Sequence, residues 1–123
     1  GRGMAISRDG GATWENYQKR SDLPAYGVQA TLIRYRMPGA TDPGEWGPLI
    51  LSAPAEGRRK MTIMLCYDEG KTWPISKLVY PGHSAYSAMR VLPDGRIALL
   101  YERDHYRRMS FVTFDMGWLT EEE

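Results

Sequence analysis

The feature that most constrains the fold of this chain is a short segment that occurs twice. The residues SRDGGATW at 7–14 match CYDEGKTW at 66–73, with aspartate, glycine, threonine and tryptophan in the same register. Ser7 and Cys66, which open the two copies, are 59 residues apart in the sequence. Internal repetition on this scale is typical of architectures built from repeated supersecondary units. The sequence therefore predicts a repeat architecture.

Around these segments, short apolar runs alternate with Gly, Pro and Asp, which predicts β-strands joined by turns. The Pro/Gly-rich segment 38–47 predicts a surface loop, and the tail from Leu119 is expected to fray. So many short strands indicate an all-β fold, and about four strands per repeat indicate the antiparallel blades of a β-propeller. The expected strands are 3–8, 28–37, 48–53, 60–67, 75–80, 86–92, 96–102 and 109–115.

Each repeated segment has the residues of a self-contained turn. The carboxylates of Asp9 and Asp68 can accept hydrogen bonds from backbone N–H groups of the turn. Gly11 and Gly70 can supply a positive φ without steric cost, and the tryptophan is expected to bury its ring in the sheet. Calcium needs six or more oxygen ligands, which one aspartate per turn does not supply, so we predict structural turns. Their residues are Asp9, Gly11, Thr13, Trp14, Asp68, Gly70, Thr72 and Trp73.

Composition excludes several functional classes. The chain has 123 residues, enough for about one small domain, and its net charge of +1 gives no reason to expect nucleic acid as a partner. No apolar run is long enough for a membrane-spanning helix. The single Cys66 excludes an internal disulfide and needs no reactive role, and the few His and Cys residues predict no metal site or other cofactor. The chain begins at Gly1 without a signal-peptide pattern, so its localisation is unknown.

The second half of the chain carries a more specific pattern. It reads SAPAEGRRKMTIMLCYDEGKTWPISKLVYPGHSAYSAMRVLPDGRIALLYE, with an arginine before the second repeat turn, then AYS, then LYE. In this order the pattern resembles the last third of the catalytic domain of sialidases (neuraminidases), whose Asp box (BNR repeat) the repeated turns also resemble. The resemblance runs from Ser7 to FDMGWL near the end. It implies that residues 1–123 are the C-terminal portion of a six-bladed propeller, with about two to three four-stranded antiparallel blades.

The resemblance also implies functional residues. Tyr86 matches the catalytic nucleophile, and Arg58 matches the third arginine of the triad that binds the sialic acid carboxylate. Glu102 matches the glutamate that orients another triad arginine. Arg59 remains an alternative to Arg58, because a slip of one residue exchanges them. Gln29 falls where the family often has a pocket-lining segment, so we expect it to contact the substrate.

These residue types suit the chemistry of a sialoside. The sugar carries its carboxylate on the anomeric carbon, so an Asp or Glu nucleophile would meet a like charge at close range. Tyr86 avoids this repulsion, and a Tyr nucleophile is a known exception to the two-carboxylate scheme of glycosidases. With an ordinary pKa of about 10, the phenol needs a carboxylate to take its proton. A covalent glycosyl-enzyme should follow, with retention of configuration. Arg58 can bind the carboxylate with two parallel hydrogen bonds, so the two side chains must meet at one pocket.

The residue types alone leave other interpretations open. Tyr86 could instead be a half-buried tyrosine with a packing role in a strand, and Glu102 could be a surface carboxylate at a strand end. The run RRK at 58–60 could be a solvated basic edge. His83 could line the mouth of the pocket, although a loop histidine is the simpler interpretation. His105, within an arginine-rich run, is expected in a solvated loop.

The resemblance implies an exo-α-sialidase that hydrolyses terminal sialic acids from glycoconjugates with retention. Its acid/base aspartate, its activating glutamate and two triad arginines match no residue here, and Arg2 lies too close to the first Asp box. The chain alone is therefore expected to be inactive, and its status as an enzyme in its own right stays open. Its expected partners are a sialylated glycan or free sialic acid and the rest of the propeller. The start at Gly1 in mid-pattern favours a longer parent chain over association of copies.

Two alternatives to this function remain. The chain could be a non-catalytic Asp-box propeller fragment or glycan-binding module that retains the carboxylate clamp without turnover. It could also belong to a hydrolase with another substrate or reaction, such as a related trans-sialidase. Neither linkage preference nor the choice between hydrolysis and transfer can be read from the sequence.

Overall fold

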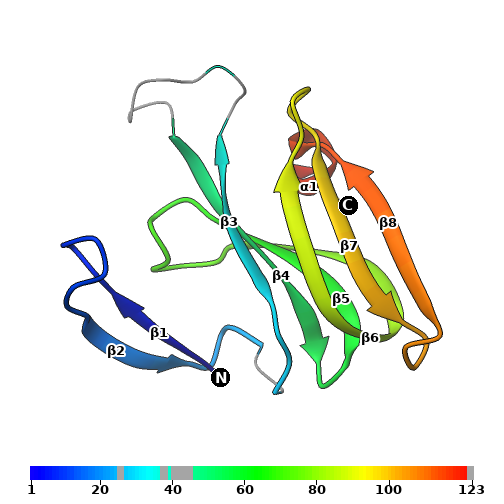
Figure 1. Ribbon diagram of the computed structural model, residues 1–123, viewed down its shortest axis with the longest axis horizontal. Helices are drawn as coiled ribbons and strands as arrows, with labels where there is room; N and C mark the ends of the chain where they lie inside the picture. The colour runs from blue at the N-terminus through cyan, green and yellow to red at the C-terminus, as the bar shows by residue number, and fades with distance from the viewer. Residues whose placement is uncertain (25–26, 37–38, 40–45, 122–123) are drawn as a thin grey trace.

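The computed structural model describes residues 1–24, 27–36, 39 and 46–121, which form a two-stranded hairpin and a six-stranded sheet (Figure 1). Every neighbouring pair of strands is antiparallel and follows the order of the sequence. The all-β prediction is confirmed. The elements are β1 (Arg2–Ile6), β2 (Glu15–Arg20), β3 (Thr31–Arg36), β4 (Trp46–Glu56), β5 (Arg59–Cys66), β6 (Ile75–Val91), β7 (Ile97–Arg103), β8 (Arg108–Phe114) and α1 (Met116–Thr120).

The larger sheet differs from the expected four-stranded blades, because six strands are joined in one curled sheet. The reason lies in β6, which replaces the two strands expected at 75–80 and 86–92. Its first part pairs with β5, as far as His83 opposite Arg59, and from Ser84 onward it pairs with β7. In Figure 1, β6 bends between these two partners. The two predicted runs therefore correspond to two pairing halves of a single strand.

The structure differs from the sequence-based expectation at three further places. Strand β2 was not expected, because its sequence ENYQKR has no alternation of apolar and polar residues. In the structure its side chains are almost all exposed. The tail from Leu119 does not simply fray, since Leu119 is buried in α1, whose N-cap Asp115 accepts a 2.8 Å hydrogen bond from Trp118 N. Of the loop expected at 38–47, Trp46 and Gly47 begin β4, and most of the rest lies outside the described residues.

An apolar cluster holds the six-stranded sheet and α1 together. Its fully buried members come from β4, β5, β7 and the helix, and each aliphatic side chain of this size contributes about 1.5–3 kcal/mol when it is removed from water. This layer gives the strands that carry the candidate site a rigid support. The cluster consists of Ile50, Met61, Ile63, Leu65, Met89, Ile97, Leu99, Tyr101, Phe114 and Leu119.

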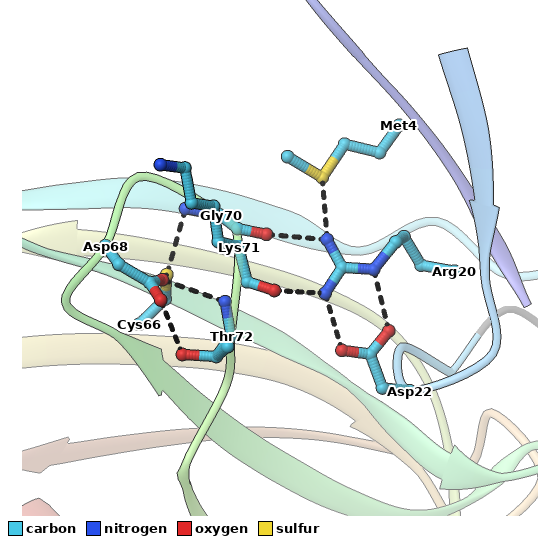
Figure 2. A network of polar contacts seen from close by, with 8 residues as sticks. All are labelled: Met4, Arg20, Asp22, Cys66, Asp68, Gly70, Lys71 and Thr72. Carbon is cyan, nitrogen blue, oxygen red and sulfur yellow. Dashed lines mark hydrogen bonds and ion pairs between the residues drawn. The ribbon is translucent and has the colours of Figure 1, made fainter. Parts of the chain in front are cut away.

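Arg20, the last residue of β2, ties the hairpin to the sheet (Figure 2). Its guanidinium donates 2.7 Å hydrogen bonds to the carbonyl oxygens of Gly70 and Lys71, in the second Asp box. Asp22 accepts two further bonds from the same group, at 2.9 and 2.6 Å, and so raises the pKa of Arg20. Met4 Sδ lies 3.5 Å from Arg20 Nη1. The hairpin is thus attached to the sheet through the backbone of a turn.

The two Asp boxes have the same internal hydrogen bonds. In the first box, Asp9 accepts bonds from Thr13 N at 2.9 Å and Thr13 Oγ1 at 2.5 Å, and Ser7 Oγ bonds to both Asp9 Oδ1 and Gly11 N at 2.8 Å. Gly11 has a φ of 98°, as expected. The Trp14 ring, however, is 65% exposed, so its predicted burial is wrong. The box is held by polar contacts within the turn.

In the second box, Cys66 takes the place of the serine. Its thiol lies 3.0 Å from Asp68 Oδ1 and accepts a bond from Gly70 N at 2.9 Å. Thr72 donates to Asp68 from its backbone at 2.8 Å and from its hydroxyl at 2.6 Å. Burial raises the pKa of the Cys66 thiol, so it stays protonated and can donate to the carboxylate. The partly buried Trp73 lines a cleft of about 360 Å³ between β1 and the sheet.

The Asp boxes predict acid sensitivity of the fold. Hydrogen bonds from the Thr13 side chain and backbone lower the pKa of Asp9 from 3.8 to about 2, and those from Thr72 and Cys66 lower the pKa of Asp68 further. Carboxylates with a lowered folded pKa stabilise the fold fully above the unfolded value and lose this effect as the pH falls through the folded value. We therefore expect the melting temperature to fall from about pH 4 downward.

Thermal melts between pH 2 and pH 6 would measure this effect. The variants Asp9→Asn and Asp68→Asn should melt at lower temperature than the wild type at pH 6 and should depend less steeply on acid. Glu121→Gln, at the exposed end of α1, is the matched control and should keep the wild-type slope. A wild-type slope in both aspartate variants would contradict the assignment.

Candidate functional site

Tyr86 lies at a β-bulge in β6. Ser84 pairs with Arg103 and Ser87 pairs with Tyr101, so β6 has one more residue than β7 between these two pairs. Bulges of this kind leave a residue out of the ladder and re-aim side chains, and they are common beside active sites. The Tyr86 side chain is 49% exposed, in contrast to the buried Ala85 before it.

Side chains complete the hydrogen bonding of the bulge. Tyr86 N donates to Glu102 Oε1 at 3.0 Å, and Ser87 N donates to Gln29 Oε1 at 3.2 Å. The Gln29 amide is held in turn by a 2.9 Å bond from Nε2 to Ala30 O. Two of the residues singled out in the sequence, Glu102 and Gln29, therefore support the backbone on either side of Tyr86.

Behind the bulge, two serines anchor the strand to the interior. Ser87 Oγ lies 2.7 Å from Ser52 Oγ, and both side chains are buried. The Ser87 carbonyl also accepts a 2.5 Å bond from Thr31 Oγ1, which links β6 to β3. These contacts fix the backbone from which Tyr86 projects.

A surface hollow of about 310 Å³ lies in front of the bulge, in the size range of small-ligand sites. Tyr86 and Glu102 both line it, and the alternation of side chains along β7 places Glu102 on the same face as Leu100. The hollow combines a phenol, a carboxylate and an amide with an apolar wall. Its lining residues are Gln29, Tyr86, Ser87, Ala88, Leu100, Glu102 and Met109.

Arg58 is the arginine of the pair that reaches Tyr86. It lies in the turn between β4 and β5, after Gly57 with its φ of 58°, and its guanidinium carbon is 5.8 Å from the centroid of the Tyr86 ring. Arg59 begins β5 and is exposed, opposite His83 in β6. Arg58 and Tyr86 therefore lie close together, although Arg58 is not among the residues that line the hollow. The separation of 5.8 Å is within cation–π distance.

The Arg58 guanidinium is held by two groups that the sequence did not indicate. Nη1 donates to the Tyr106 hydroxyl at 2.5 Å, and Nη2 donates to Gly27 O at 3.0 Å. The hydrogen bond that Arg58 donates to the Tyr106 hydroxyl raises the pKa of Arg58, so the guanidinium stays charged at any working pH. Tyr106 belongs to a polar run, RDHYRR, whose composition predicts only a solvated loop. Only the fold brings it to Arg58.

His83 also differs from its expected position. It lies within β6, not in a loop, and its ring stacks on His105 with centroids 4.4 Å apart. Burial and the neighbouring positive groups lower the pKa of His83, so this imidazole is neutral near pH 7.

No helix in the described part of the chain is long and apolar enough to cross a membrane.

Comparisons with known proteins show which family the chain is related to. The fold and site define the class: an all-β chain with two Asp boxes and with a tyrosine, an arginine and a glutamate gathered at one bulged strand. The chain is 35% identical over 121 residues to a sialidase from Micromonospora viridifaciens and 35% identical over 114 residues to an anhydrosialidase from Macrobdella decora. It is therefore a homologue of the sialidases over most of its own length.

The match covers only a small part of the relatives. It includes 96% of this chain and 18% of the Micromonospora protein, and 79% of this chain and 14% of the Macrobdella protein. No family model matches the chain.

Two solved structures have a similar fold over nearly the whole of this chain. A leech intramolecular trans-sialidase complexed with 2,7-anhydro-Neu5Ac is 27% identical, with a TM-score of 0.76 over 96% of this chain and 20% of that one. An intramolecular trans-sialidase from Ruminococcus gnavus in complex with oseltamivir carboxylate has a TM-score of 0.76 over 98% of this chain and 29% of that one. At 23% identity, the second match supports the fold alone.

Proposed function

We propose that the protein is an exo-α-sialidase that removes terminal sialic acids from glycoconjugates with retention of configuration, and that this chain supplies the nucleophile and part of the carboxylate clamp. The observation that carries the proposal is the meeting of Arg58, Tyr86 and Glu102 at one bulge, with the guanidinium carbon 5.8 Å from the Tyr86 ring. Homology with sialidases supports it, although the chain spans less than a fifth of the curated relatives' length.

In the proposed reaction, Tyr86 Oη attacks the anomeric carbon, and the bond from that carbon to the leaving oxygen breaks. A carboxylate takes the phenol proton, and an acid donates a proton to the leaving group. Water then attacks the same carbon and releases Tyr86. Two displacements at one carbon restore its configuration. A neutral phenol suits this position because the substrate's own carboxylate is attached to the reacting carbon.

The other residues of the site have supporting roles in this proposal. Arg58 binds the substrate carboxylate, and Glu102 orients a further arginine while it accepts the N–H of Tyr86. Gln29 lines the hollow beside the sugar. We assign no role in the clamp to Arg2, whose side chain bonds to Pro24 O at 2.9 Å and to Val28 O at 3.2 Å.

We further propose that residues 1–123 form the C-terminal portion of a six-bladed propeller. The hairpin β1–β2, the strands β3 to β6 and the strands β6 to β8 would then belong to successive blades, with β6 shared by two of them. The change of partner at Ser84 in β6 supports this division. The acid/base aspartate, the activating glutamate and two more arginines would come from the remainder of the ring.

An assay of two proteins tests the function. One is the complete protein, which means this chain together with the rest of the proposed propeller, and the other is the 123-residue chain alone. We expect the complete protein to release the fluorophore from a fluorogenic sialoside, and the isolated chain to give no measurable turnover. Proton NMR of the first product should show the anomer with retained configuration. Matched fluorogenic hexosides without a carboxylate are the control and should not be cleaved. Binding of sialic acid without turnover by the complete protein would instead support a glycan-binding module.

Intramolecular transfer is a second candidate function. It is favoured by the 27% identical neighbour with 2,7-anhydro-Neu5Ac bound and by the anhydrosialidase among the sequence relatives. In that reaction the sugar's own O7, rather than water, displaces Tyr86 from the anomeric carbon. The same NMR experiment separates the two, because transfer yields the 2,7-anhydro sugar and hydrolysis yields free sialic acid.

A further inference from the structure

Tyr106 lies in a turn whose backbone conformation is unusual. Asp104, His105 and Tyr106 connect β7 to β8 with φ values of 54°, 57° and 67°, so three successive residues other than glycine adopt the left-handed region. Such conformations persist only where the surrounding structure determines them, and they are frequent at functional sites. The turn therefore requires an explanation from its contacts.

Contacts with β6 fix this turn. Asp104 N donates to His83 O at 3.1 Å, and His105 N donates to His83 Nδ1 at 2.8 Å. The His83 ring stacks on His105 and meets the Tyr106 ring edge-on, with centroids 5.1 Å apart. The Tyr80 hydroxyl bonds to the Asp104 carboxylate. Together these contacts hold the Tyr106 side chain at one place beside β6.

The fixed tyrosine meets the guanidinium of Arg58. Nη1 of Arg58 donates to the Tyr106 hydroxyl, while Nη2 donates to Gly27 O on the segment before β3. An unrestrained arginine has many rotamers, and each hydrogen bond to a fixed acceptor reduces the freedom that must be lost when a ligand binds. Both acceptors hold Arg58 near the Tyr86 ring, 5.8 Å away, with other N–H groups left for a ligand.

We propose that Tyr106 is a positioning residue for the carboxylate clamp: its hydroxyl, set by the left-handed turn and His83, holds Arg58 in place to bind the substrate carboxylate. This inference rests on the proposed function, because it assigns Arg58 to that carboxylate. The inference goes beyond the proposed function because it adds a residue that does not touch the substrate. Tyr106 acts on substrate binding through Arg58 and takes no part in bond cleavage.

The test uses the complete protein and compares two inhibitors, N-acetylneuraminic acid and its methyl ester. Tyr106→Phe removes the hydroxyl and keeps the ring. We expect it to weaken inhibition by the acid about tenfold and inhibition by the ester hardly at all, because only the acid has a free carboxylate for Arg58. For a sialoside substrate, KM should rise about tenfold with kcat within about twofold of the wild type.

Two further variants make the test specific. Tyr67→Phe removes the hydroxyl of another exposed tyrosine, beside the second Asp box, and should change neither inhibitor. In an Arg58→Ala background, Tyr106→Phe should have no further effect on inhibition by the acid, because the group that it positions is absent.

Each other outcome overturns the inference. Equal weakening of acid and ester would show general damage to the site, and unchanged inhibition by both would show that the Tyr106 hydroxyl does not position Arg58. An additive loss in the Arg58→Ala background would place its effect elsewhere. A wild-type protein that neither binds nor cleaves sialosides would overturn the proposed function and this inference together. The first three outcomes leave the proposed function intact.

Discussion

Tyr86→Phe in the complete protein is expected to lower kcat for sialoside hydrolysis by about a thousandfold or more, the range found when a nucleophile is removed. The substitution keeps the aromatic ring, and the Tyr86 side chain is half exposed. The hydrogen bond to Glu102 is also retained, because Tyr86 donates it from its backbone N–H. The variant should therefore fold and bind substrate normally. Steady-state kinetics and a thermal melt together measure both properties.

The control for Tyr86→Phe is the same substitution at Tyr67, which should leave kcat unchanged. A second observation concerns the intermediate: a fluorinated sialosyl inhibitor that traps glycosyl-enzymes should add its mass to the wild type and not to Tyr86→Phe. Wild-type turnover by Tyr86→Phe, or an adduct on another residue, would show that the phenol is not the nucleophile.

Arg58→Ala is expected to reduce kcat/KM by roughly a hundredfold, which is typical of the loss of one partner from a directly bonded charge pair. Most of the effect should appear in KM, because in the proposed reaction Arg58 binds the carboxylate both before and during bond cleavage. Arg58→Lys should recover only a small part of it, since an ammonium cannot form two parallel hydrogen bonds with a carboxylate. Kinetics with a fluorogenic sialoside would measure all three proteins.

The neighbouring Arg59 provides a matched control for Arg58. Both residues carry the same charge, but Arg59 is exposed at the start of β5, whereas Arg58 reaches the Tyr86 ring. Arg59→Ala should therefore change kcat/KM by less than about twofold. If Arg59→Ala caused the larger loss, the match of Arg58 to the third arginine of the triad would be wrong by one residue.

Much of the fold could be predicted from local patterns, and the failures arise where contacts between distant parts of the chain decide the structure. Alternation and turn residues identified most strands, because those strands bury one face. Strand β2 has no such pattern, and it exists because it pairs with β1 and because Arg20 holds its end against the second Asp box. The N-cap of α1 is a local feature, because Asp115 and Trp118 are three positions apart. The stability of the helix nevertheless depends on Leu119, which packs in a core formed by distant strands.

The candidate site shows a similar division. Tyr86, Arg58 and Glu102 could be found because the resemblance supplied a register, and their proximity then followed from the fold. The bulge at Tyr86 and the contact of Arg58 with Tyr106 had no signal in the sequence, since hydrogen bonds between residues 48 positions apart leave no local pattern. Gln29 was found by position, whereas its bond to Ser87 N appears only in three dimensions.

The sequence by itself determined the all-β class and the two Asp boxes, because these depend on strand periodicity and on hydrogen bonds between residues at most four positions apart. Only the tertiary structure decided that β6 serves two sets of partners and that Arg58 rather than Arg59 faces Tyr86. The reason is physical. A short turn fixes its own backbone, whereas a strand's partner and a long side chain's direction depend on what the rest of the chain packs around them.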